Sequence, residues 1–242
     1  MESPLKISAT ALEEGVGARV WRLFPSPLIR SFDPFVLLDE FFVKAGTGFP
    51  EHPHRGFEAV TYMLGGSFRH RDTLGNDTTV PEGGVQRFSA GRGIVHSEMP
   101  GGEEGCHGFQ LWINLPLHLK KSDPQYQQVN PDQINSENEG GLKIRTVVGG
   151  NSPVKHFTPI QFKDYRITGA SLLSVPLFSH NGFIYVYKGE IETDSGHLNS
   201  HEALFCQKNG VVQVETSDMA SFIMVSGSPL NQPIVLSGSF VE

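Results

Sequence analysis

Apolar and polar residues alternate with a period of two in many short segments of the chain, which is typical of half-buried β-strands. In residues 109–115 (FQLWINL), for example, Phe, Leu, Ile and Leu occupy every second position. The same texture predicts strands over 17–23, 56–64, 67–72, 85–89, 142–148, 170–175, 183–187, 203–207, 211–215 and 221–225. No long amphipathic helix is visible, and 116–126 holds one helical turn at most. The pattern therefore predicts an all-β protein and excludes doubly wound and TIM-barrel folds.

Turn-forming residues divide these strands and suggest a division into domains. Gly65-Gly66 is expected to turn the first strand of a hairpin into the second, and further turns are expected at 74–77 and 82–84. The segment 131–141 (PDQINSENEGG) is rich in turn formers and acids, and the β texture resumes beyond it. We therefore expect two tandem antiparallel β-sandwich or barrel domains, 1–130 and 131–242, since such folds bury one face of every strand and protect its edges.

Composition narrows the classes of partner. The 242 residues are 38% hydrophobic and 10% aromatic, as in a globular protein. The net charge of −7 argues against direct nucleic-acid binding, and no apolar run approaches the ~20 residues that cross a bilayer. The first residues (MESPLK) do not resemble a secretory signal, and the two cysteines form no disulfide framework. We expect a cytoplasmic protein, with the nucleus as a second location in a eukaryote.

Two pairs of potential metal ligands stand out. His52 and His54 are two residues apart, so in an extended segment both point to one face, with Cα atoms about 6.5–7 Å apart. His96 and Glu98 repeat this spacing. Either pair alone is more simply explained as a solvated turn or loop end. Together, on neighbouring strands, they predict a four-ligand metal site.

The same residues carry a family resemblance. The spacing Gly46-x5-His52-x-His54-x3-Glu58-x6-Gly65 matches the first cupin motif, and the strings GFPEHPHRGFE (48–58), AGRGIVHSEMP (90–100) and QLWINL (110–115) closely resemble the pirin family. The resemblance is dense in the N-terminal half and fragmentary in the C-terminal half. It implies two tandem cupin domains, with the first residues pairing into the second domain. It also implies iron ligands at His52, His54, His96 and Glu98.

Some positions depart from the general cupin pattern. The second cupin motif appears in the pirin variant, in which Glu98 replaces a more distant ligand. Glu58 lies four residues after His54, on the same strand face but ~13 Å along it unless the strand bends, so we expect it to support the site or act as a base. The chain is shorter than pirins with a C-terminal helical extension, so partner contacts made by such an extension are expected to be missing.

The C-terminal half lacks an HxH pair. His180, His197 and His201 lie near predicted turns and are expected to be exposed to solvent. We therefore expect the second domain to be free of metal.

Three imidazoles and one carboxylate leave a divalent ion with a charge of +1 and, at six-coordination, two open positions. The resemblance favours Fe(II), with Mn, Ni, Co, Cu or Zn as alternatives. It implies an enzyme resembling quercetin 2,3-dioxygenase, which opens a small aromatic, flavonol-like substrate with O₂. Glu98 is the first candidate for the catalytic proton acceptor and Glu58 the second. The apolar pocket is expected to draw on Phe49, Phe57, Phe88, Met99 and Phe109.

Two other functions fit the same residues. The resemblance also implies an iron-dependent, redox-sensing regulatory protein of the transcriptional co-regulator type, which acts through a protein partner. A sugar or phosphate isomerase would need a basic side chain in the pocket, and only His70 or Arg55 lies near the motifs in sequence.

Overall fold

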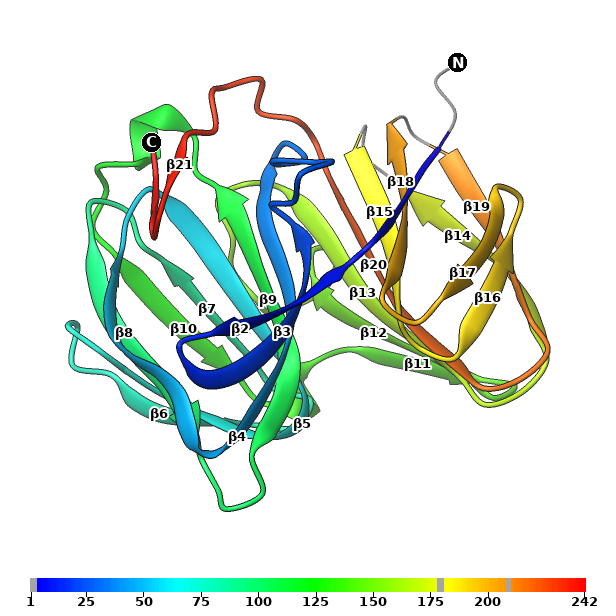
Figure 1. Ribbon diagram of the computed structural model, residues 1–242, viewed down its shortest axis with the longest axis horizontal. Helices are drawn as coiled ribbons and strands as arrows, with labels where there is room; N and C mark the ends of the chain where they lie inside the picture. The colour runs from blue at the N-terminus through cyan, green and yellow to red at the C-terminus, as the bar shows by residue number, and fades with distance from the viewer. Residues whose placement is uncertain (1–3, 178–180, 208–209) are drawn as a thin grey trace. The chain divides into compact units, whose positions relative to one another are not determined.

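Figure 1 shows a computed structural model that describes residues 4–177, 181–207 and 210–242. Almost all of its regular structure is β, with 3-10 helices at Leu117–Leu119 (η1) and Pro131–Gln133 (η2). Within these residues no helix is long and apolar enough to span a membrane. The all-β prediction is confirmed.

The chain forms two compact units, each assembled from separate segments. The N-terminal unit contains 10–133, 153–158 and 230–242, and the C-terminal unit contains the described residues of 1–9, 134–152 and 159–229. The turn-rich segment 131–141 instead predicts a single boundary between residues 130 and 131. In the structure both ends of the chain cross over, so that each unit is completed by residues distant in sequence.

A closed ring of strands forms the centre of the N-terminal unit. β4 and β5 each pair with both β8 and β9, all antiparallel, and such closure leaves these strands without free edges. The outer strands complete the order β10-β7-β5-β8-β4-β3-β2, and β6 pairs with β5. The bounds are β2 Thr10–Glu14, β3 Val16–Phe24, β4 Phe35–His54, β5 Phe57–Asp72, β6 Asp77–Pro81, β7 Val85–Ser89, β8 Ile94–Pro100, β9 Cys106–Asn114, β10 Gln125–Val129, β21 Leu236–Ser237 and β22 Phe240–Val241.

Glycines bend the long strands at two places. The predicted turn at Gly65-Gly66 is wrong, since β5 continues through both residues with an irregularity in its pairing to β9. A Cβ at Gly66 would lie 2.3 Å from the carbonyl oxygen of Gly105, so only glycine permits this close pairing. The real turn is at Gly56, where φ is 83°. It ends β4 at His54 and puts Glu58 on the next strand, rather than ~13 Å further along the same one.

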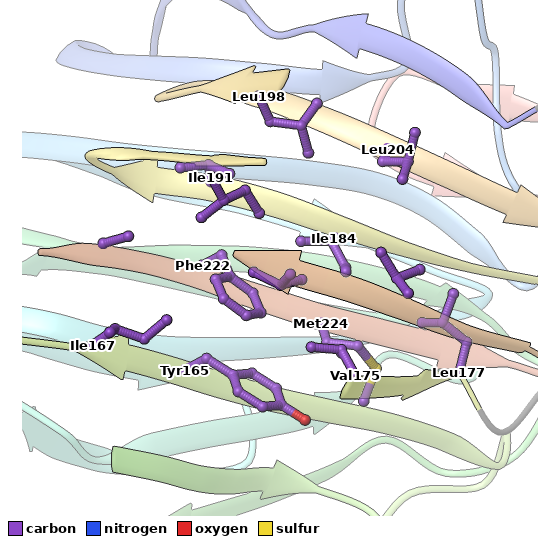
Figure 2. Packing of buried hydrophobic residues seen from close by; sticks show 14 residues of the cluster. Tyr165, Ile167, Val175, Leu177, Ile184, Ile191, Leu198, Leu204, Phe222 and Met224 are labelled. Carbon is purple, nitrogen blue, oxygen red and sulfur yellow. The ribbon is translucent and has the colours of Figure 1, made fainter. Parts of the chain in front are cut away.

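Two sheets pack together in the C-terminal unit. One has the order β1-β18-β15-β20-β13-β12-β11 and the other β14-β19-β16-β17. Side chains from both sheets form one apolar cluster, including Tyr165, Leu177, Ile191 and Phe222 (Figure 2). The bounds are β1 Leu5–Ser8, β11 Ser136–Glu139, β12 Leu142–Val148, β13 Ile160–Ile167, β14 Ser171–Leu177, β15 Asn181–Lys188, β16 Glu190–Thr193, β17 Gly196–Asn199, β18 Glu202–Gln207, β19 Gly210–Thr216 and β20 Ala220–Gly227.

The structure tests what the sequence predicts for the first residues and for the histidines of the second half. β1 pairs with β18, which confirms that the first residues join the second domain. His197 belongs to strand β17 rather than to a loop, and its ring is half-buried beside Glu192, 2.7 Å from a carboxylate oxygen. His201 is also partly buried, with its Nδ1 3.2 Å from the Tyr185 hydroxyl. The expectation of a solvent-exposed side chain is therefore wrong for His201, whereas 38% of the His197 side chain is exposed. His180 lies outside the described residues.

Candidate metal centre

Strand register brings the two predicted ligand pairs together. β8 lies between β4 and β5, and in the β4–β8 ladder His96 is opposite His52. On the other side of β8, Asp72 is opposite His96 and His70 is opposite Glu98. The expectation that the HxH and HxE pairs occupy neighbouring strands is confirmed.

The imidazoles of His52, His54 and His96 converge on one another. Their ring centroids are 4.5–4.8 Å apart, and one nitrogen from each ring lies within 4.8 Å of the others. The two Nε2 atoms of His52 and His96 are 3.0 Å apart. Neighbouring ligands on one ion with bonds of about 2.1 Å are also separated by about 3.0 Å, so this spacing fits a divalent cation.

Backbone carbonyls determine which nitrogen faces the cluster. Nδ1 of His52 is 2.7 Å from the oxygen of Pro50, and Nδ1 of His54 is 3.2 Å from the oxygen of Ser239. A carbonyl oxygen only accepts hydrogen bonds, so both Nδ1 atoms carry the proton and both Nε2 atoms present a lone pair. Metal-binding histidines are commonly oriented by such outer hydrogen bonds.

Burial keeps the rings neutral. Desolvation, followed by the nearby His52 ring, lowers the pKa of His54 to about 3. Desolvation also lowers the pKa of His52, and it lowers that of His96 well below the ordinary value, with the neighbouring rings adding to the effect. Neutral imidazole is the form that binds metal, so the cluster is prepared for a cation without first losing protons.

Glu98 lies beside the cluster in a cradle of amides. Its Oε2 accepts a hydrogen bond of 3.1 Å from Nε2 of Gln110, and its Oε1 accepts one from Gln86. Burial raises the pKa of Glu98 to about 7, although the Gln86, Thr61 and Gln110 side chains oppose the shift. The carboxylate is grouped within 4.8 Å with nitrogens of His70 and His96, rather than with all three converging imidazoles.

Glu58 is occupied elsewhere. Its fully buried carboxylate pairs with the guanidinium of Arg87 and accepts hydrogen bonds from the backbone amides of Phe157 (3.0 Å) and Thr158 (3.1 Å). These contacts hold residues 153–158 within the N-terminal unit. Its position favours a supporting role over proton transfer.

A cavity of about 590 Å³ opens onto the cluster. Its wall contains His52, His54, Glu98 and Gln110, together with the aromatic side chains Phe41, Phe49, Phe68 and Trp112. Of the aromatic residues expected around the pocket, Phe49 lines it, whereas Phe57 and Phe88 lie behind His54 and pack on its ring. The cavity is large enough for a small aromatic molecule.

The sequence offers His70 only as a base for the isomerase alternative, and it assigns Asp72 no role. Both side chains are fully buried, and Nδ1 of His70 lies 3.4 Å from Nδ1 of His96, on the side of that ring away from His52. Their two-residue spacing is the same signal that marked the other pairs. The sequence shows it, but only the β5–β8 register reveals that His96 is the partner.

Two tandem antiparallel β domains, one of which encloses a histidine cluster beneath a cavity, define the class: the chain is a protein with two cupin domains. It belongs to the pirin family. The family model for Pirin matches residues 17–113, and the model for the Pirin C-terminal cupin domain matches 163–242.

Named relatives agree with this assignment. A pirin-like protein from Solanum lycopersicum is 39% identical over 98% of this chain and 84% of its own length. Human pirin is 36% identical over 100% of this chain and 89% of its own. Among solved structures, a quercetin 2,3-dioxygenase from Acinetobacter baumannii superposes with a TM-score of 0.90 at 27% identity, covering 100% of this chain and 92% of that one.

Proposed function

We propose that this protein is a metal-dependent dioxygenase that opens the ring of a flavonol such as quercetin with O₂. The observation that carries the proposal is the convergence of the His52, His54 and His96 imidazoles beside an aromatic-lined cavity of about 590 Å³. The likeness to quercetin 2,3-dioxygenases supports the reaction class.

The donor set supports a particular coordination. Three imidazole nitrogens would hold a divalent ion, and Glu98 would supply the fourth ligand. Because the cluster contains histidine and carboxylate but no thiolate, it suits Fe(II), our first candidate, as well as Mn, Ni, Co or Cu. The bound ion would supply Lewis acidity and a template for substrate oxygens.

The chain's own residues have separate tasks in this proposal. Phe49, Phe68 and Trp112 would hold the flat rings of the substrate and exclude water. Glu98 would accept the proton of the substrate hydroxyl at one of its carboxylate oxygens. Gln86 and Gln110 donate to the two oxygens of that carboxylate, which keeps its plane fixed. We leave Glu58 out of the proton transfer because two N–H groups of Arg87 and the backbone amides of Phe157 and Thr158 already donate to its oxygens.

Oxygen uptake by anaerobically purified, Fe(II)-loaded protein tests the proposal. We expect quercetin to stimulate uptake, and we expect His54→Ala to abolish it together with metal binding. His197→Ala is the matched control, because it removes a half-buried histidine from the C-terminal unit and should leave uptake unchanged. A fully loaded wild-type protein that consumes no oxygen with quercetin or related flavonols would contradict the proposal and favour the regulatory alternative.

A further inference from the structure

A buried chain of three side chains ends at His96. Nε2 of His70 lies 2.9 Å from Oδ2 of Asp72, and Nδ1 of His70 lies 3.4 Å from Nδ1 of His96. The side chains of His70 and Asp72 have no exposed surface, and His96 is 1% exposed. Water therefore does not compete for these contacts.

The positions of the protons on His70 and His96 follow from the fact that Asp72 is a hydrogen-bond acceptor. The oxygens of Asp72 accept from the backbone amides of Leu74 and Asn76 and from the Asn76 side chain, so the carboxylate acts as an acceptor. Nε2 of His70 must then carry the proton that lies toward Asp72. In a neutral ring this leaves a lone pair on Nδ1 of His70, which accepts from Nδ1–H of His96.

We infer that Asp72 and His70 are positioning residues that fix the tautomer of His96, leaving its Nε2 unprotonated and directed at His52. The inference rests on the proposed metal site for its purpose, but its geometry is independent of any ion. The inference gives His96 the same tautomer as His52 and His54, whose Nδ1 protons are directed at backbone carbonyl oxygens.

The alternative tautomer would disable the cluster. A proton on Nε2 of His96 would lie in the 3.0 Å gap to Nε2 of His52 and satisfy that nitrogen by a hydrogen bond. His96 would then have no lone pair to offer at this nitrogen, and the lone pair of His52 would be occupied by the N–H of His96. A cation could bind only after His96 lost this proton or its ring exchanged tautomers against the pull of His70.

Asp72→Asn is designed to reverse the direction of the hydrogen bonds that link Asp72, His70 and His96 while retaining the size of the side chain. The backbone amides of Leu74 (2.9 Å) and Asn76 (3.1 Å) both donate to Oδ1, so they should hold the oxygen of the new amide in that place. Its NH₂ group then takes the place of Oδ2, faces Nε2 of His70 and donates to it. Nδ2 of Asn76 lies 2.8 Å from Oδ2, so the Asn76 side-chain amide must turn its oxygen toward the new NH₂ group. The proton of His70 moves to Nδ1, which donates to His96 and forces the proton of His96 onto Nε2.

The experiment is ¹⁵N NMR of the histidine rings in the metal-free protein, followed by titration with Co²⁺. We expect the wild type to show His96 protonated at Nδ1 and Asp72→Asn to show it protonated at Nε2. We expect the variant to bind Co²⁺ about 10- to 100-fold more weakly. The tautomer is measured without metal or substrate, so a failure of the proposed dioxygenase activity leaves this test intact.

Asp77→Asn is the matched control, because Asp77 is an exposed carboxylate that pairs with Arg69 near the same hairpin. It should leave both readouts unchanged. The inference is overturned if folded Asp72→Asn protein keeps the proton of His96 on Nδ1, or binds Co²⁺ as the wild type does.

A second pair of variants decides the matter if Asp72→Asn disturbs the hairpin. His70→Gln retains a donor for Asp72 and an acceptor for His96, whereas His70→Leu retains neither. We expect Gln at this position to restore most of the Co²⁺ affinity that Leu loses. Equal affinities in the two variants would show that His70 contributes only packing, which would overturn the inference.

Discussion

Replacing Glu58 by glutamine is expected to destabilise the N-terminal unit while leaving metal affinity nearly unchanged. The carboxylate is fully buried, and it satisfies the Arg87 guanidinium and the amides of Phe157 and Thr158 together. A glutamine has one oxygen for these donors, and its NH₂ group must face at least one of them. The substitution therefore replaces an acceptor with a donor where only acceptors fit.

The size of the effect follows from burial. An unsatisfied buried donor costs about 1–3 kcal/mol, and the lost charge on the partner of Arg87 adds to this, so Glu58→Gln should cost about 2–4 kcal/mol. Arg87→Met leaves a buried carboxylate without its cation and should cost about 3–5 kcal/mol. For a unit of roughly 140 residues, a loss of about 3 kcal/mol corresponds to a fall in Tm of about 10 °C.

Urea unfolding of both variants, followed by Co²⁺ titration under native conditions, measures the two consequences separately. Asp77→Asn removes a carboxylate from an exposed ion pair and serves as the control for loss of charge alone. The reasoning is refuted if Glu58→Gln unfolds at the wild-type urea concentration but loses quercetin turnover by tenfold or more. That result would restore the proton-accepting role that the sequence suggested for Glu58.

Two further substitutions test how the ends of the chain are held. The Lys120 ammonium donates to Val241 O (3.0 Å) and two other oxygens, so Lys120→Met should lower the free energy of unfolding by about 2–3 kcal/mol in urea, and an unchanged value would contradict this. Burial acts to raise the pKa of Glu202, but hydrogen bonds from Asn199 and Lys6 outweigh it and lower that pKa to about 2. The pKa of an unfolded glutamate is about 4.3, so these contacts stabilise the folded protein above that pH. Their stabilising effect is lost as the pH falls toward 2 and Glu202 becomes protonated. Amide protection in β1 should fall over this range, and Lys6→Met should weaken the dependence; equal dependence in both proteins would contradict the assignment.

Local pattern was sufficient for many strands and failed where distant pairing decides. β7 and β12 have the bounds predicted from alternation alone, 85–89 and 142–148. Gly65-Gly66 looks like a turn, but pairing with β9 carries strand β5 through both residues. His197 looks like part of a loop, but pairing with β16 makes it part of a strand.

The candidate site divides in the same way. Two-residue spacing was enough to select His52, His54, His96 and Glu98, because period two in a strand fixes which side chains share a face. The sequence could not show that Gln86 and Gln110 hold Glu98, since those contacts join β7, β8 and β9. It also could not distinguish Glu58 as a buried ion pair, because residues 157–158 lie about a hundred positions away.

X-ray absorption at the iron edge of the Fe(II)-loaded protein tests the central claim most directly. We predict one ion per chain, with three imidazole nitrogens at about 2.1 Å and the remaining ligands oxygen. His52→Ala and His96→Ala should each remove one imidazole from this shell or release the ion. An iron site with oxygen ligands alone, or three imidazoles retained at the iron in either variant, would contradict the account.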